Sequence, residues 1–186
     1  KETLQYQSNK TLPLNGELDL LKGVYNRIQE DYGVSATGFK LQTFVDAPAG
    51  SGLGTSSTLV VAIIGAFAEM LKLPLGEYDI AHYAYQIERK YLNLAGGRQD
   101  QYAATFGGVN YMEFYEQDKV IVNPLRIKSE YLSELENNLV LFYTASSRES
   151  ATIIKEQQKN VELKKEGSID AMHQLKEQSR MMKEAL

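Results

Sequence analysis

Cysteine is absent from this sequence of 186 residues, which excludes disulfide bonds and thiolate metal sites. An excess of basic charge is absent too, because the formal net charge is −4, so the positive field of a nucleic-acid-binding protein is lacking. No apolar run reaches the roughly 18 residues that a membrane-spanning helix needs. These absences are compatible with an intracellular setting. We expect a cytoplasmic protein with no nucleic-acid or membrane partner.

Apolar residues make up 43% of the sequence, enough for a sizeable core. The length suits one large domain or one and a half. The first residues resemble neither a signal peptide nor a start, and residues 181–186 end inside a helical pattern with no capping glycine. We therefore expect a piece of a longer protein.

Hydrophobic periodicity predicts both helices and strands in the first half of the chain. Helical spacing runs over residues 17–32 and stops at Gly33. Residues 39–45 alternate in the manner of a strand. An apolar helix then extends to about residue 71, and a second one covers residues 77–92.

The second half predicts a hairpin, a strand and two helices. Residues 109–114 and 120–122 flank a turn and predict the hairpin. The apolar residues 139–143 predict a buried strand. Two charged, amphipathic helices follow, at residues 149–165 and 169–186.

The most distinctive stretch reads P-A-G-S-G-L-G-T-S-S over residues 48–57. Three glycines alternate in five residues, and glycine lets backbone N–H groups approach a ligand closely. Thr55, Ser56 or Ser57 can cap the apolar helix that follows. That end of a helix carries partial positive charge and unpaired N–H donors, so it suits a phosphate. A hydroxyl there can also touch a phosphate-bound Mg²⁺ ion.

A glycine- and serine-rich run is more often a flexible loop before a core helix, and that interpretation stays open. The continuous apolar helix directly after the hydroxyls favours the phosphate loop. Two better-known phosphate loops do not fit. A Walker A loop needs a lysine that is absent here, and the dinucleotide fingerprint needs a different glycine spacing.

The run at residues 48–57 resembles the second motif of the GHMP kinases, P-x-x-x-G-L-G-S-S-[AS], with threonine at its first hydroxyl. The resemblance implies that the loop wraps the phosphates of ATP. It implies that a hydroxyl near the end of the loop helps to hold Mg²⁺, which by position is Ser56, with Thr55 the next choice. The implied nucleotide-binding residues are Pro48, Gly50, Ser51, Gly52, Leu53, Gly54, Thr55, Ser56 and Ser57.

A second cluster reads G-G-R-Q-D-Q-Y over residues 96–102. Taken alone, Asp100 is more often a helix cap or a surface carboxylate. A kinase, however, needs a carboxylate that takes or orients the proton of the acceptor hydroxyl. The segment is similar to the family pattern G-x-x-D-[NQ] with a later glycine pair, and this resemblance places the catalytic aspartate at Asp100.

Glu88 lies on the predicted helix over residues 77–92. By default it is a solvated side chain on that helix. The resemblance implies a Mg²⁺-binding glutamate here, in the context Glu88-Arg89. Mg²⁺ prefers one or two carboxylates together with phosphate oxygens and water, which Glu88 and Ser56 would satisfy.

Three further residues are candidates for the acceptor site. Arg98, beside Asp100, is either a surface arginine or a ligand of an anionic substrate. Ser147 is more often a helix cap. Arg148 in a first helical turn goes against the macrodipole preference, which hints at a bound substrate phosphate. His82 and His173 lack partners at metal-ligand spacing.

The resemblance implies an α+β fold. A two-layer N-terminal GHMP domain, its start missing, would cover residues 1–130, and the truncated beginning of a second α+β domain would cover residues 131–186. The polar stretch at residues 128–138 is the candidate boundary. The family's first and third motifs are absent, so we expect a chain of these residues alone to be a poor or inactive kinase.

Within the family, the likeness is greatest to bacterial kinases of D-glycero-D-manno-heptose 7-phosphate, over most of the chain from Leu18 onward. This implies phosphorylation of a sugar phosphate at its anomeric C1 hydroxyl to the 1,7-bisphosphate. Relatives often have glycine where this chain has Ala145. The alternatives are a kinase of fucose, galactose or a mevalonate-type alcohol, or a non-catalytic sugar- or nucleotide-binding relative. The sequence does not predict an oligomeric state.

Overall fold

The computed structural model describes residues 4–6, 10–34, 38–47, 50–142, 150–165 and 167–186. They fall into two compact units, Lys1–Phe106 and Gly107–Leu186. The first unit contains helices α1 (Asp19–Tyr32), α2 (Thr55–Leu71) and α3 (Glu77–Tyr85), the π-helical segment η1 (Gln86–Tyr91) and helix α4 (Gln99–Phe106). The second contains strands β1 (Asn110–Phe114) and β2 (Val120–Pro124) and helices α5 (Ser129–Asn138), α6 (Ser150–Glu162) and α7 (Ser168–Ala185).

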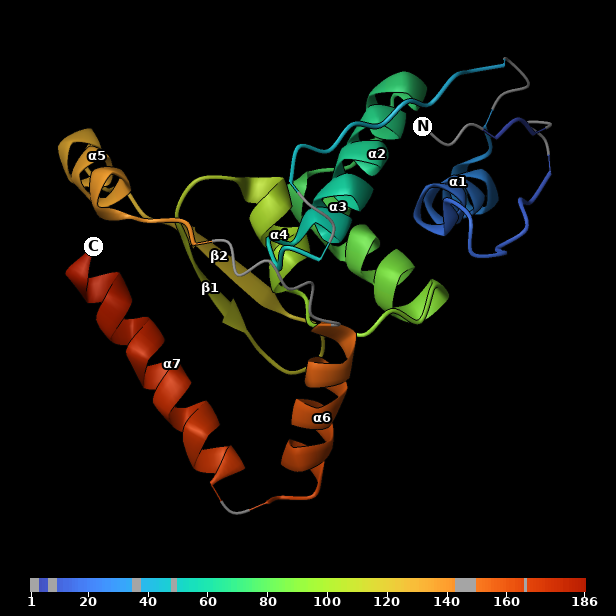
Figure 1. Cartoon of the computed structure of the whole chain (residues 1–186). Helices are drawn as coiled ribbons and strands as arrows, with labels where there is room; N and C mark the ends of the chain where they lie inside the picture. The colour runs from blue at the N-terminus through green and yellow to red at the C-terminus, as the bar shows by residue number, and fades with distance from the viewer. Residues whose placement is uncertain (1–3, 7–9, 35–37, 48–49, 143–149, 166) are drawn as a thin grey trace. The chain divides into compact units, whose positions relative to one another are not determined.

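Helix α2 is central to the core of the first unit (Figure 1). It contacts α1, α3 and α4. Its apolar residues at helical spacing are at most 3% exposed, and burying each of them contributes about 1.5–3 kcal/mol. The core therefore fixes the position of the N-terminal end of α2, which follows the glycine-rich run. These buried residues are Val60, Ile63, Ile64 and Phe67.

The helix predicted over residues 77–92 is present, but it changes its winding part-way. Helix α3 ends at Tyr85, and the next six residues form the π-helical segment η1. The backbone N–H of Leu92 donates to Ile87 O at 2.9 Å, which closes the wider turn. Short π-helical turns inside helices are frequent at functional sites, because they reorient the side chains they carry. Glu88 is one of these residues.

The predicted hairpin of the second unit is confirmed. Strands β1 and β2 pair in antiparallel register, with Met112 opposite Val122. Between them Gln117 and Asp118 both have positive φ, as a tight hairpin turn requires. Helices and a separate antiparallel hairpin make this an α+β chain, as predicted.

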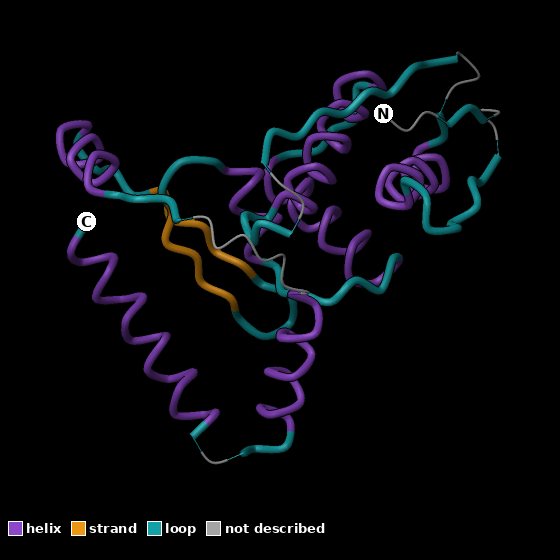
Figure 2. The backbone as a smooth tube through the Cα atoms, in the orientation of Figure 1, coloured by secondary structure: helices purple, strands orange, loops and turns teal. Residues whose placement is uncertain are grey.

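The strand predicted over residues 39–45 is wrong. Residues 38–46 form neither helix nor strand (Figure 2), although Leu41 packs against the core of the first unit. Phe44 is 85% exposed. A strand needs a neighbouring strand for its N–H and C=O groups, and β1 and β2, the strands of the described residues, pair with each other.

The buried strand predicted over residues 139–143 is wrong for its first four residues, and Tyr143 lies outside the described ones. Residues 139–142 form neither helix nor strand, and their exposed fractions run from 68% to 85%. The apolar side chains there have no covering layer among the described residues, so hydrophobicity alone does not make a strand.

The two C-terminal helices are confirmed as α6 and α7, with Gly167 between them at φ 81°. The polar stretch at residues 128–138 contains α5. The compact units divide the sequence after Phe106, and the domain division at residue 130 stays a prediction. Among the described residues, the helices are too short or too polar to cross a membrane.

Candidate active site

In the glycine-rich run before α2, three glycines have left-handed backbone conformation. Gly50, Gly52 and Gly54 have φ angles of 73°, 75° and 67°. Positive φ is costly for residues with a side chain, which explains why glycine recurs at alternate positions. Backbone that reverses its sense in this way can direct successive N–H groups toward a bound anion.

The capping residue of α2 is Gly54, and the expected hydroxyl cap is wrong. No side chain makes a capping hydrogen bond at this end. The N–H and the Oγ1 of Thr58 both donate to Gly54 O, each at 3.0 Å. The first turn contains no acidic residue. The amides of the first turn are thus not capped by a side chain, and the helix dipole favours negative charge there.

Asp100 lies directly against the end of the glycine-rich run. A Cβ built on Gly54 would lie 3.2 Å from Asp100 Cγ and 3.3 Å from its Oδ1. Asp100 sits in the first turn of α4 and is exposed. A carboxylate therefore stands beside the N-terminus of α2, close to where a bound phosphate would lie.

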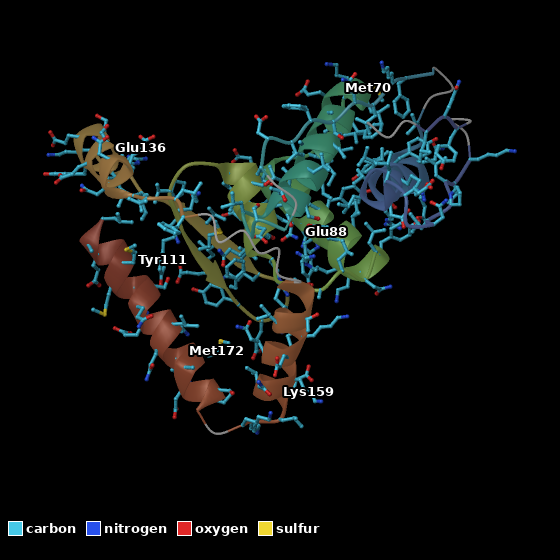
Figure 3. All side chains as sticks on the ribbon, viewed as in Figure 1. Met70, Glu88, Tyr111, Glu136, Lys159 and Met172 are labelled. Atoms are coloured by element: carbon cyan, nitrogen blue, oxygen red, sulfur yellow. The ribbon has the colours of Figure 1, made fainter. Side chains whose placement is uncertain are left out.

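Glu88 reaches the same end of α2 from η1 (labelled in Figure 3). Its carboxylate is fully buried, and its Oε1 accepts a hydrogen bond of 3.0 Å from Ser56 Oγ. A buried carboxylate is costly unless donors surround it. The default interpretation of Glu88 as a solvated surface residue is therefore wrong.

Gln101 completes the contacts of Glu88. Its Nε2 donates to Glu88 Oε2 and also to Ser57 Oγ at 3.1 Å, and the whole Gln101 side chain is buried. Sequence reasoning did not assign a role to Gln101. The signal was present in the D-[NQ] pair of the family pattern, whose second position it occupies.

Arg89 was named in the sequence only as the neighbour of Glu88, without a role of its own. Its Nη1 lies 3.8 Å from Glu88 Oε1, and its Nε donates to Gly97 O at 3.0 Å. A Cβ on Gly96 would lie 2.6 Å from Arg89 Cζ. The guanidinium thus occupies the space beside the glycine pair and fixes the turn that leads to Asp100.

The candidate acceptor residues are placed only in part. Arg98 is half-buried, and its Cζ lies 4.9 Å from the centre of the Tyr85 ring, which is cation–π geometry. Ser147 and Arg148 lie outside the described residues, as does Pro48 of the nucleotide loop.

The donor set at the N-terminus of α2 fits a magnesium ion. Ser56 and Glu88 offer two oxygen ligands 3.0 Å apart. In the part of the chain that the structure describes, no group of three or more acidic or histidine side chains could hold a metal. Mg²⁺ does not need such a cage, because it is usually bound by one or two carboxylates plus phosphate oxygens and water.

The comparison with protein families gives a match to the GHMP kinases N terminal domain over residues 19–108. The chain is 54% identical, over 98% of its length, to D-glycero-alpha-D-manno-heptose 7-phosphate kinase of Campylobacter jejuni, of which it covers 53%. It thus spans about half the length of this curated relative. Fucokinases, galactokinases and a mevalonate kinase match at 26–31% identity.

Two solved structures resemble the chain. A D-glycero-D-manno-heptose 1-phosphate kinase from Bacteroides thetaiotaomicron has a TM-score of 0.70 and 54% identity, covering 82% of this chain and 50% of that one. A putative sugar kinase from Campylobacter jejuni has a TM-score of 0.66 and 50% identity, covering 86% of this chain and 52% of that one.

Proposed function

We propose that this chain, which belongs to the GHMP kinase family, provides the phosphate loop, metal ligands and acidic residue of an ATP-dependent sugar-phosphate kinase. One observation carries the proposal. Asp100 and Glu88, which come from different elements, both lie at the N-terminal end of α2, against Gly54 and Ser56. A phosphoryl-transfer site needs this combination of amide donors, a metal ligand and a carboxylate.

The triphosphate of ATP binds at residues 50–57 in this proposal. The N-terminus of the 17-residue helix α2 supplies partial positive charge and amide donors without a side-chain cap. The left-handed glycines let the backbone approach the phosphates closely. Because this proposal makes ATP the phosphoryl donor, we also propose a cytoplasmic location.

Ser56 and Glu88 hold Mg²⁺ in this proposal. An ion held there would supply positive charge to offset the negative charge that develops on the phosphoryl group during transfer. The chain's part is to present the Ser56 hydroxyl and the Glu88 carboxylate at a fixed separation of 3.0 Å. Because Glu88 is fully buried, bulk water does not compete for its oxygens.

Asp100 orients the acceptor hydroxyl and takes its proton. The hydroxyl oxygen then bonds to the γ-phosphorus, the bond from that phosphorus to the β,γ-bridging oxygen breaks, and ADP leaves with the electron pair. The exposed position of Asp100 beside Gly54 leaves it accessible to an acceptor while it faces the phosphate loop.

The acceptor in this proposal is D-glycero-D-manno-heptose 7-phosphate, phosphorylated at its C1 hydroxyl to the 1,7-bisphosphate. The support is the 54% identity to a heptose 7-phosphate kinase, against 26–31% for the kinases of other substrates. Arg98, Ser147 and Arg148 are the proposed contacts to the sugar phosphate, since arginine and hydroxyl donors recognise phosphate oxygens.

The position of the phosphate on the sugar is the point to test first, because one relative is called a 7-phosphate kinase and a structural neighbour a 1-phosphate kinase. A panel of heptose 7-phosphate, heptose 1-phosphate, fucose, galactose and mevalonate would separate the acceptors. Turnover of the 7-phosphate alone supports the proposal. Sugar binding with no phosphoryl transfer on any of them would instead indicate a non-catalytic relative.

The mechanism is tested by Asp100→Asn in the whole gene product that contains this sequence. We expect turnover to fall by orders of magnitude while ATP affinity changes little, because Asp100 acts on the acceptor hydroxyl. Asp118→Asn, the same change in the exposed hairpin turn, is the matched control and should keep normal turnover. Near-normal turnover of Asp100→Asn would remove Asp100 from the mechanism.

A further inference from the structure

Gln101 is a fully buried polar residue next to the proposed catalytic aspartate. Its amide nitrogen has two protons, and both are used: one donates to Glu88 Oε2 and the other to Ser57 Oγ. The nitrogen end of the amide must face Glu88, because a carboxylate accepts hydrogen bonds and does not donate them. One side chain on α4 therefore ties η1 to the first turn of α2.

The two oxygens of Glu88 are held by different partners. Oε1 accepts from the Ser56 hydroxyl at 3.0 Å, and Oε2 accepts from the Gln101 amide. If the amide were removed, the carboxylate would lose the partner that fixes its rotation and would keep only its bond to Ser56 and the more distant Arg89 guanidinium. The orientation of the Glu88 carboxylate toward the phosphate loop thus depends on Gln101.

The carbonyl oxygen of the Gln101 amide shows that this orientation costs free energy. Gln101 Oε1 is buried and has no hydrogen-bond partner among the described residues. A buried acceptor without a partner is unfavourable. A residue needed only to fill space would be better replaced by an apolar side chain of the same size. The unpartnered oxygen is explained if the amide nitrogen is required where it stands.

We infer that Gln101 is a positioning residue for the magnesium site: it fixes the Glu88 carboxylate so that Oε1 and Ser56 Oγ face the metal together. The inference rests on the proposed function. Residues that hydrogen-bond a metal ligand without touching the metal typically contribute about 10–100-fold to metal affinity. Because Asp100 precedes Gln101 on α4, the same residue also links the metal ligand to the helix that carries the acid.

The test measures metal binding directly, in the whole gene product with a non-hydrolysable ATP analogue. Mn²⁺ replaces Mg²⁺ as a probe and is titrated by electron paramagnetic resonance. Gln101→Met removes the amide at nearly constant volume. Gln99→Met makes the same change at an exposed position of the same helix turn and serves as the matched control. Glu88→Gln reports on the metal ligand itself.

We expect Gln101→Met to weaken Mn²⁺ binding by about 10–100-fold, with nucleotide affinity in the absence of metal unchanged. The Mg²⁺ concentration for half-maximal turnover should rise in parallel, while the KM for the sugar phosphate stays constant. Gln99→Met should behave as wild type. Gln101→Asn, which keeps an amide but withdraws it by one methylene, carries the same expectation, so the test survives if one variant does not fold.

Two results would overturn the inference, and they differ in meaning. If Glu88→Gln loses Mn²⁺ while both Gln101 variants bind it as wild type does, Gln101 has no positioning role and the proposed function stands. If Glu88→Gln also binds Mn²⁺ normally, the magnesium site of the proposed function is wrong and the inference fails with it.

Discussion

The side chain of Asp100 lies so close to Gly54 that a methyl group on Gly54 would stand 3.2 Å from Asp100 Cγ. This glycine therefore meets two separate requirements. Its φ of 67° suits a residue without a side chain, and its missing Cβ leaves room for the acid. The phosphate loop and the proposed catalytic residue are thus fitted to each other.

Gly54→Ala should consequently lower both the stability of the chain and its kcat. The left-handed backbone alone costs an alanine about 1–2 kcal/mol. The added Cβ would also push Asp100 away from the loop, which should lower kcat further. The measurements are the free energy of unfolding in urea and kcat of the whole gene product.

Gly16→Ala is the control for the Gly54 prediction. Gly16 has φ 91°, and a Cβ there meets nothing within 4 Å. It should lose comparable stability and keep its kcat. Equal kcat values for the two variants would show that the contact with Asp100 is not what the glycine protects.

The neighbouring glycines Gly96 and Gly97 should differ in how much stability the same substitution costs. In Gly96→Ala the new Cβ would lie 2.6 Å from Arg89 Cζ at a φ of 149°, so the guanidinium must move and release Gly97 O. We expect a loss of about 1–3 kcal/mol from overpacking, to which the positive φ of Gly96 adds. Gly97→Ala meets nothing within 4 Å and should stay within about 0.5 kcal/mol of wild type.

The free energies of unfolding of the two variants, from thermal or urea unfolding, test this expectation. The variants carry the same substitution at adjacent positions. A Gly97→Ala variant as unstable as Gly96→Ala would mean that the pair is needed for backbone flexibility and not for the packing of Arg89.

The parts of the fold that could be predicted are those whose information is local. The apolar run of α2 is long enough to specify a core helix, and the turn at Gln117 and Asp118 between two apolar segments specifies the hairpin. The segments at residues 39–45 and 139–142 have strand-like patterns as well. A pattern, however, records which face of a segment is apolar and not whether a neighbouring strand exists to pair with it.

Motif resemblance predicted those residues of the candidate site whose side chains would touch ligands. Ser56, Glu88 and Asp100 were singled out in this way, and the structure brings them together. Gln101 and Arg89 were given no role because each acts through contacts with Glu88 in the π-helical segment η1, which periodicity does not reveal. The bonds of Gln101 to Glu88 and Ser57 join different elements, so the folded arrangement is needed to show them.

Tyr83→Phe should weaken the attachment of α3 to α1 in a pH-dependent manner. Tyr83 Oη donates to Asp31 Oδ2 at 2.7 Å, and Arg27 pairs with the same carboxylate at 2.9 Å. Burial, and then the hydrogen bond to Asp31, raise the pKa of the Tyr83 phenol well above its usual 10. Losing this charge-assisted bond should cost about 1–2 kcal/mol at neutral pH.

The sign of the pH dependence of the Tyr83 effect follows from the raised pKa. Below pH 10 the phenol is neutral in the folded and the unfolded chain, so its full contribution is present. Above pH 10 the unfolded chain ionises first, and the contribution falls as pH rises toward the folded pKa. The stability difference between wild type and Tyr83→Phe, measured by urea unfolding, should therefore shrink between pH 9 and pH 11. A difference that grows over this interval would contradict the assignment. Tyr131→Phe, at an exposed tyrosine, controls for the loss of a hydroxyl.

The exposed apolar segment at residues 139–142 should make the chain Lys1–Leu186 associate with itself. Leu141 is 84% exposed, and among the described residues the segment pairs with no strand, so we expect it to associate with the same segment of another copy. Leu141→Lys should reduce this association in sedimentation velocity while changing the free energy of unfolding by less than about 0.5 kcal/mol. Met181→Lys adds the same charge at a residue of α7 that is 61% exposed. Because the backbone of α7 already bonds within its helix, that variant should associate as wild type does. An equal reduction in both variants would mean that net charge, and not the exposed apolar segment at residues 139–142, governs the association.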